Sequence, residues 1–220
     1  MNAPVDTVPA ATNPREVWEA LLNGNERFAV EKSLYPHQDL AYRKTLLAGQ
    51  RPRACVFTCA DSRVPVELLF DVGLGDIFVV RTAGEVLDNG VLASLEYAVS
   101  GLGVQVLVVL GHEFCGAVGA ATSMVTGGTM LPSHQRVLIE QITPSVLECY
   151  GAGKKEAKEV ESHHAKMTLE KIRQTSPLIA DAITAGDLVG VAAHFELTTS
   201  KVTEVYYLHK EDSAQTHPAQ

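Results

Sequence analysis

Short, continuously apolar runs alternate along the chain with longer segments whose apolar residues recur every three or four positions. The runs are rich in β-branched and aromatic residues and are apolar on both faces, which is typical of buried parallel strands. They lie at residues 54–59, 77–81, 104–111 and 188–197. A further run at 201–208, joined to the last through Thr198-Thr199-Ser200, predicts a hairpin at the end of the sheet.

The intervening segments predict helices. The first begins at Asn13-Pro14, with asparagine as the cap and proline in the first turn, and carries an apolar stripe that includes Trp18 and Phe28. A Gly/Ala-rich helix follows Cys115, and others are predicted at 39–48, 65–70, 89–100, 134–150, 155–174 and 176–186. The segment 155–174 is heavily charged, so we expect that helix to be solvated.

Strands that alternate with helices predict an α/β fold: a mainly parallel central sheet with helices on both faces and an N-terminal helical arm. Without repeats or a clear linker, we expect one domain over residues 13–220. Residues 1–12 are rich in Ala, Pro and Thr and are predicted to be a disordered tail.

Charge and composition narrow the class of protein. The net charge of −8 argues against a nucleic-acid or anionic-membrane partner, and no apolar run is long enough to span a bilayer. The first residues lack the features of a secretory signal, so we expect a cytoplasmic protein. In a reducing compartment, metal binding is a better use of the four cysteines than disulfides.

Two short motifs follow two of the predicted strands. Cys59-Ala-Asp61-Ser-Arg63 ends the first strand, and His112-Glu-Phe-Cys115 ends the strand at 104–111. The carboxyl ends of parallel strands form the ligand-binding edge of open α/β sheets. Two thiols and one imidazole at that edge predict a catalytic zinc site with a fourth position left open. The alternative is two buried core thiols and a loop histidine.

The residues around these motifs leave further alternatives. Asp61 can accept a proton from water on the metal, occupy the open metal position, or form an ordinary salt bridge with Arg63. Cys55 and Cys149 have no such neighbours and are interpreted as structural. The remaining histidines are scattered, and for most of them we expect solvated surface positions.

Together the residues resemble the β-class carbonic anhydrases, whose two signatures are Cys-x-Asp-x-Arg and His-x-x-Cys. The similarity also includes Gly49-Gln50-x-Pro52, Gly75-Asp76-Ile77-Phe78-Val79-Val80-Arg81 and Ser94-Leu95-Glu96-Tyr97-Ala98-Val99. It extends over residues 14–208 and is densest from 50 to 119. The resemblance implies a zinc lyase that hydrates carbon dioxide reversibly to bicarbonate through zinc-bound hydroxide.

The resemblance also implies roles for individual residues. One Zn²⁺ per chain would be held by Cys59, His112 and Cys115, with Asp61 and Arg63 as a gating dyad. The implied substrate-binding residues are Gln50, Phe78, Ala83, Tyr97 and Gly116. In this family the pocket forms across a dimer interface, which implies a homodimer or a dimer of dimers in which Gln50, Phe78 or Tyr97 serves the neighbouring zinc.

Val56 occupies the position where bicarbonate-regulated members carry tryptophan, so the resemblance implies the unregulated, open-site subtype. The chain departs from the family at Glu113-Phe114, between the expected ligands, and at Glu85. Two other functions stay open: hydrolysis of another heterocumulene such as carbon disulfide, and a non-catalytic, structural zinc protein.

Overall fold

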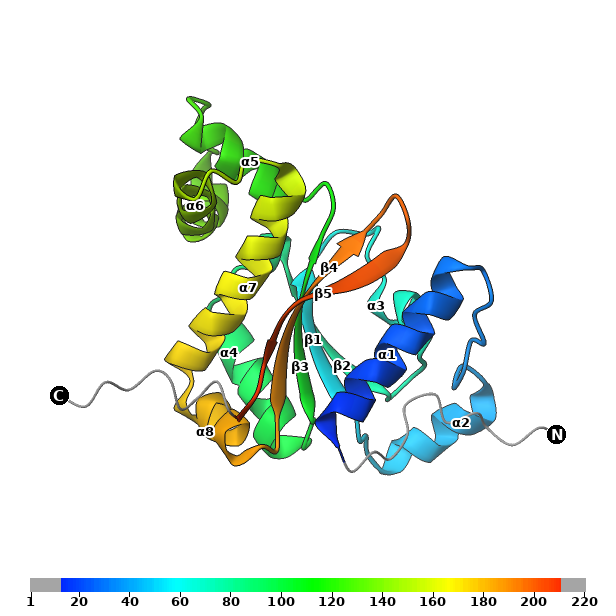
Figure 1. Cartoon of the computed structure of the whole chain (residues 1–220). Coiled ribbons are helices and arrows are strands. Elements are labelled where there is room, and N and C mark those ends of the chain that lie inside the picture. The colour runs from blue at the N-terminus through cyan, green and yellow to red at the C-terminus, as the bar shows by residue number, and fades with distance from the viewer. Residues whose placement is uncertain (1–12, 211–220) are drawn as a thin grey trace.

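The computed structural model describes residues 13–210 of the 220-residue chain and places five strands in one sheet of order β2-β1-β3-β4-β5 (Figure 1). The predicted tail at 1–12, like residues 211–220, lies outside the described residues. The strands are β1 (Ala54–Cys59), β2 (Ile77–Thr82), β3 (Val106–His112), β4 (Val189–Glu196) and β5 (Lys201–Leu208).

Neighbouring strands are parallel from β2 to β4, and β5 returns antiparallel to β4 as the predicted hairpin. The register places Cys59 beside Thr82 and Gly111 beside His194. Because β1 and β3 are parallel neighbours, Cys59 and His112 emerge at the same edge of the sheet. The mainly parallel α/β fold is therefore confirmed.

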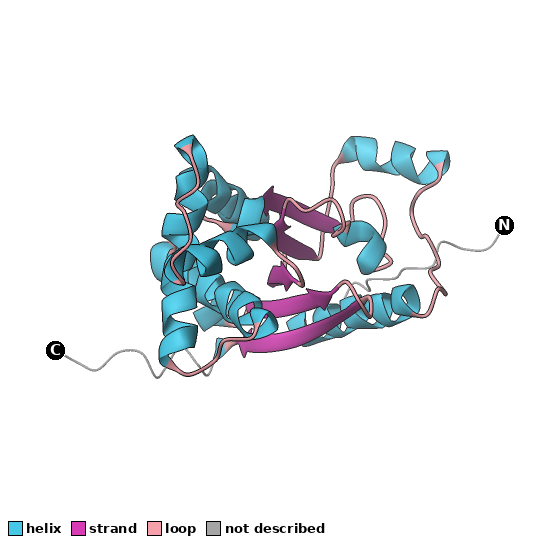
Figure 2. Cartoon of the chain, turned by 90° about the horizontal axis from the view of Figure 1, so that it is seen from above, coloured by secondary structure: helices cyan, strands magenta, loops and turns pink. Residues whose placement is uncertain are grey.

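Helices cover both faces of this sheet (Figures 1 and 2). One side carries α1 and α3, and the other carries α4, α7 and α8, while α2 lies apart from the sheet and α5 and α6 pack together beyond the carboxyl ends of the strands. The helices are α1 (Pro14–Ala29), α2 (Leu40–Thr45), α3 (Val66–Leu69), α4 (Asn89–Glu96), α5 (Gly116–Val125), α6 (Arg136–Gly151), α7 (Ala157–Thr175) and α8 (Pro177–Ala185).

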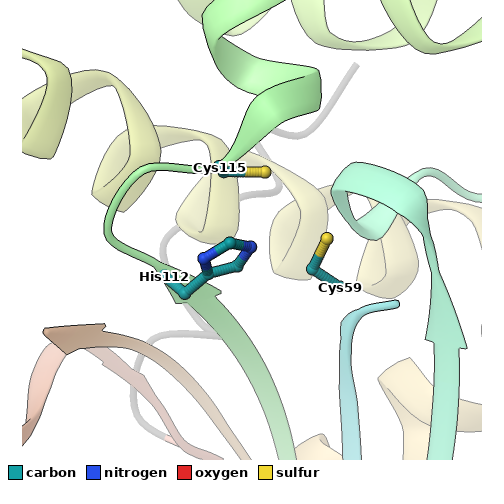
Figure 3. A group of neighbouring side chains, drawn as sticks. All are labelled: Cys59, His112 and Cys115. Carbon is teal, nitrogen blue, oxygen red and sulfur yellow. The ribbon is translucent and has the colours of Figure 1, made fainter. Parts of the chain in front are cut away.

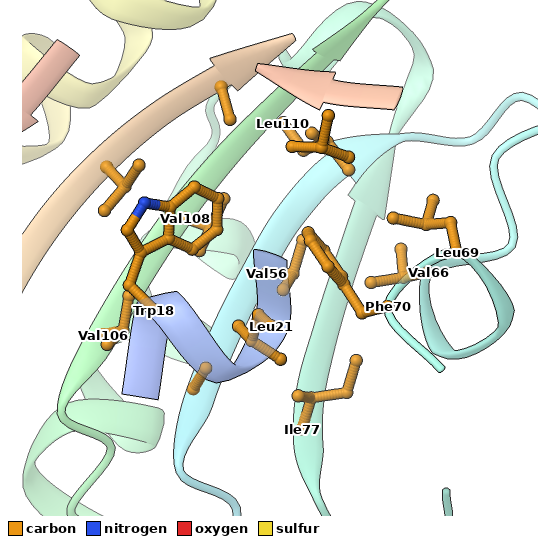
Figure 4. Close-up of a cluster of buried hydrophobic side chains, with 14 of the residues drawn as sticks. Trp18, Leu21, Val56, Val66, Leu69, Phe70, Ile77, Val106, Val108 and Leu110 are labelled. Atoms are coloured by element: carbon orange, nitrogen blue, oxygen red, sulfur yellow. The ribbon is translucent and has the colours of Figure 1, made fainter. Parts of the chain in front are cut away.

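The face under α1 is closed by an apolar cluster (Figure 4). Helix α1 begins as predicted, since Asn13 accepts the Arg15 backbone N–H and Pro14 needs no partner for its nitrogen. Its buried side chains Trp18 and Leu21 pack with Val56 and Val108 of the sheet. The N-terminal helix therefore covers its own chain's sheet.

The opposite face corrects one prediction, because α7 is not solvated. Apart from the buried Glu161, its charged residues are exposed or half-buried, while an inward stripe of Ala165, Leu169 and Ile172 packs against Leu107 and Val109 of β3. The high charge of the segment concealed this narrower apolar stripe.

The element boundaries agree closely with the sequence pattern. Strands β1 and β5 have the predicted limits, and β2 continues one residue further, to Thr82. Two predicted helices end in other helical turns: a 3₁₀ turn at Leu46–Ala48 follows α2, and a π-helical turn at Tyr97–Gly101 follows α4. Between residues 13 and 210, no helix is both long and apolar enough to cross a bilayer.

Candidate metal centre

Three metal-binding side chains converge where β1 and β3 end (Figure 3). Cys59 is the last residue of β1, His112 is the last of β3, and Cys115 directly precedes α5. Their donor atoms lie within 4.8 Å of one another, and all three residues are buried. Within the described residues, this is the one such group of His, Cys, Asp and Glu donors.

The imidazole of His112 is oriented for coordination. Its Nδ1 lies 2.9 Å from the Glu113 carbonyl oxygen, which can accept an N–H but cannot donate one. That contact leaves the Nε2 lone pair free, and Nε2 is buried without a hydrogen-bond partner. A metal ion between this nitrogen and the two thiols would satisfy it, so the donor set fits a metal.

The two thiols interact strongly with each other. The neighbouring Cys115 thiol lowers the pKa of Cys59 to about 4 despite the opposing effect of burial. Conversely, Cys59 and burial raise the pKa of Cys115. One thiolate thus disfavours the second, and a divalent cation would allow both to be ionised together.

The loop that carries two of the donors is fastened to three other parts of the chain. The Glu113 backbone N–H donates to the Phe195 carbonyl, and its carboxylate accepts the Thr198 backbone N–H and hydroxyl. Phe114 adopts a left-handed backbone conformation with φ of 59°, and its carbonyl accepts from Arg63. The family departure at Glu113-Phe114 therefore anchors the loop to the β4–β5 turn.

Asp61 and Arg63 form the expected pair at the mouth of the cluster. The guanidinium donates to both carboxylate oxygens, at 3.0 Å to Oδ1 and 2.7 Å to Oδ2. These bonds lower the pKa of Asp61 to about 2, so the group is a carboxylate at neutral pH. Asp61 Oδ2 lies 4.0 Å from His112 Nε2, beside the cluster.

A tight turn at Ala83–Glu85 completes the surroundings. The Gly84 backbone N–H donates to Cys59 Sγ at 3.3 Å, a bond that stabilises a thiolate. The expected substrate residues Ala83 and Gly116 lie in this turn and in the first turn of α5, and the two elements are in contact. Glu85 is buried with φ of 47°, and burial raises the pKa of its carboxyl.

Comparison with known proteins identifies this arrangement. The family model described as carbonic anhydrase matches residues 54–202, which include the three converging side chains and the Asp61–Arg63 pair. The chain belongs to the β-carbonic anhydrase family. It is therefore an enzyme of this family, whose general reaction is the hydration of carbon dioxide.

The relatives agree with this assignment over most of the chain. Carbonic anhydrase 2 of Mycobacterium tuberculosis is 45% identical over 186 residues, which cover 84% of this chain and 90% of that protein. The Coccomyxa β-carbonic anhydrase in complex with acetazolamide shares the fold, with a TM-score of 0.69, 22% identity, and coverage of 96% and 94% of the two chains. A tetrameric β-carbonic anhydrase of Sordaria macrospora does so with a TM-score of 0.67, 23% identity, and coverage of 85% and 95%.

Three substrate-binding residues implied by the family lie elsewhere in this chain. Gln50 precedes β1, and Phe78 is the second residue of β2, so both are near the amino ends of the strands, whereas Cys59 lies at a carboxyl end. Tyr97 packs edge-on against Phe78 with ring centres 6.2 Å apart. Their roles toward a metal centre stay predictions.

Several buried polar residues of this carbonic anhydrase were not expected from its sequence. His37, His164 and His194 are buried and hydrogen-bonded, so the expectation of surface positions is wrong for them. Glu161 was assigned to a solvated helix but accepts the Cys115 backbone N–H. One signal was available: His194 is the one titratable residue inside the apolar run 189–195.

Proposed function

We propose that this chain catalyses the reversible hydration of carbon dioxide, with one Zn²⁺ held by Cys59, His112 and Cys115. The observation that carries the proposal is the buried, unpartnered Nε2 of His112 facing two thiols at the carboxyl ends of β1 and β3. Zinc with three such ligands keeps one position for water and lowers the pKa of that water to near 7.

Asp61 and Arg63 are proposed to keep the site open. Asp61 Oδ2 lies 4.0 Å from His112 Nε2, and the carboxylate would fill the fourth position if it were free to turn. The bidentate contact with Arg63 fixes both of its oxygens instead. So held, the carboxylate can accept a hydrogen bond from the attacking water and orient it. Val56, at the position that is tryptophan in regulated members, favours the open-site subtype.

The substrate pocket is proposed to be completed by a second copy of the chain, with Gln50 donating to the substrate and Phe78 and Tyr97 forming an apolar wall. One chain alone places these residues away from its own cluster. The segment around α2 exposes Leu34, Tyr35, Leu40 and Leu47, the last 86% accessible, which suits an interface between subunits. The Sordaria proteins are described as tetrameric.

The free state of the four cysteines supports a reducing, cytoplasmic location.

Metal content and carbon dioxide hydration, measured by stopped flow on the same sample, test the proposal. We expect one zinc per chain and hydration activity that rises through about pH 7–8. Cys115→Ser should lose zinc and activity together. Cys149→Ala is the matched control, because Cys149 is also a buried free thiol but lies outside the cluster.

The outcomes separate the remaining functions. Zinc without hydration at any pH would favour a structural site or another heterocumulene substrate. Activity only above about pH 8 would show that Asp61 occupies the metal at neutral pH and would overturn the open-site proposal. A chain without zinc would overturn the metal centre.

A further inference from the structure

A buried acidic residue and a buried histidine lie directly behind the metal centre. Glu161 projects from α7 and His194 from β4, and both are almost completely inaccessible to solvent. Glu161 Oε1 accepts the backbone N–H of Cys115 at 3.1 Å. Its Oε2 lies 3.0 Å from Nε2 of His194, whose N–H donates to it. The two residues thus form a chain of hydrogen bonds from the sheet to a metal-binding residue.

Burying the Glu161–His194 pair costs free energy of solvation. A carboxylate removed from water loses several kilocalories per mole of solvation, which an apolar residue at the same position would not lose. Each Glu161 oxygen has one partner, and one of the two partners is the Cys115 amide. The His194 Nδ1 atom is buried without a partner, so the imidazole is committed to its single contact with Glu161.

The backbone is shaped to permit this contact. Gly111 of β3 lies beside His194 in the sheet and directly before His112. A Cβ atom at position 111 would lie 3.2 Å from the Glu161 carbonyl oxygen and 3.3 Å from the Ala165 Cβ. Glycine therefore lets α7 approach the end of β3 closely enough for Glu161 to reach the loop.

We propose that Glu161, oriented by His194, is a positioning residue for the metal centre: it fixes the Cys115 backbone so that Sγ faces Cys59 and His112. The inference rests on the proposed zinc function. The loop between the two ligands is otherwise held through Glu113 and Phe114, and among residues 13–210 the Cys115 N–H donates to Glu161 alone. Partners of this kind, one layer behind a metal ligand, commonly change metal affinity by about 10–100-fold when they are lost.

Variants at both positions test the hydrogen-bond chain. Glu161→Leu removes the acceptor of both the Cys115 N–H and the His194 N–H. His194→Leu removes the donor to Glu161, whereas His194→Gln keeps one. We expect E161L and H194L to release zinc to a chelator at least about 10-fold faster than wild type, and H194Q to release it at nearly the wild-type rate.

Two readouts besides activity distinguish positioning from a general loss of stability. The cobalt-substituted protein should show altered thiolate-to-metal absorption in E161L and H194L but not in H194Q. The Cys115 amide should exchange with solvent faster in H194L, with or without metal. The matched control is His37→Leu, which breaks the other buried histidine–carboxylate pair, to Asp76 at 2.9 Å, near the amino end of β2. It should alter neither readout.

The result that overturns the inference is wild-type zinc release, cobalt absorption and Cys115 exchange in both E161L and H194L. The inference would also be overturned if zinc release, cobalt absorption and Cys115 exchange changed as much in H194Q or H37L as in H194L. Such a result would reveal a structural effect only. Failure of the proposed function looks different: the wild-type protein itself would bind neither zinc nor cobalt through thiolates.

Discussion

At the level of single residues, Arg63 determines where the Asp61 carboxylate lies. Arg63→Gln removes the bidentate side-chain contact and leaves the backbone N–H of residue 63 on Oδ1, so the Asp61 carboxylate is less well fixed and can turn toward the metal or away from the substrate. We expect kcat/KM for carbon dioxide hydration to fall by about 10–100-fold, because catalytic groups depend on such orientation. Zinc content should not change, since Arg63 contacts none of the three donor side chains.

Arg173→Gln is the matched control for that measurement. Arg173 also makes a two-nitrogen contact with a carboxylate, Glu170, within α7 and outside the cluster. Its replacement should leave hydration within about twofold of wild type, as for most changes away from a site. Equal rates in R63Q and wild type would show that Asp61 needs no partner to stay in place.

The residues of the candidate metal centre differ in how readily a sequence reveals them. Cys59, His112 and Cys115 were predicted because they end apolar strands that the register then brings together. Glu161 was not, because its partner His194 is 33 positions away and only the packing of α7 on β4 joins them. The left-handed backbone at Glu85 and Phe114 was equally hidden, since neither residue type prefers it.

Among the elements, α1 is docked through a glycine. Gly24 faces α3, and a Cβ atom there would lie 1.8 Å from the Phe70 carbonyl oxygen, which is backbone and cannot move aside. We expect Gly24→Ala to lower the free energy of unfolding by about 1–3 kcal/mol or more. Gly119→Ala in α5 should instead raise it by about 0.5–1 kcal/mol, because position 119 has open space and alanine favours helix.

Chemical denaturation of the two variants measures this contrast. Both changes add the same methyl group to a glycine inside a helix, so the comparison removes the intrinsic effect of alanine. A stable G24A protein would mean that α1 does not pack against α3 as described.

The contact between α6, α7 and the Ala83–Glu85 turn makes stability depend on pH. His164 Nε2 lies 2.8 Å from the Gly84 carbonyl, Nδ1 lies 3.0 Å from the Ser145 hydroxyl, and burial lowers the pKa of the imidazole. In the unfolded chain, the His164 imidazole has an ordinary pKa near 6.5. As the pH falls below that value, the unfolded chain therefore binds a proton at His164 while the folded imidazole stays neutral. The stability that neutral His164 contributes is complete above about pH 6.5. As the pH falls below that value, the free energy of unfolding decreases by at most about 1.4 kcal/mol per pH unit.

The measurement is the free energy of unfolding between pH 5 and 7.5 for wild type and His164→Gln. Other groups titrate in the same range, so the difference in slope between the two proteins isolates His164. We expect the shallower slope in H164Q. Identical slopes would show that the imidazole is protonated in the folded protein without cost.

The strand limits were predicted to within two residues, because four strands are continuous apolar runs and β5 is set off by the turn at 198–200. Which face of a helix is buried was harder to predict. Helix α7 carries an apolar stripe interrupted by His164 and Thr168, both of which are buried. Polar residues that find partners inside the fold look the same in sequence as solvated ones.

For the whole molecule, the question is whether one chain is a complete enzyme. The proposed metal ligands lie at the carboxyl ends of the strands, and Gln50 lies before β1, at the opposite end. In a homodimer, the Gln50 of each chain can lie beside the metal site of the other chain, although it lies far from the site of its own. A sequence cannot show this, because positions along one chain do not indicate which copy a residue serves.

Complementation between two inactive variants decides the point. Cys59→Ser lacks a zinc ligand, and Gln50→Ala lacks the proposed donor to the substrate. In a mixed dimer, the Q50A chain keeps its zinc and receives Gln50 from the C59S chain, so one site of two is whole. Equal amounts, unfolded and refolded together, should regain about a quarter of wild-type activity, since about half of the dimers are mixed. If Gln50 serves its own chain, every site in the mixture lacks one of the two residues and activity stays at the level of the separate variants.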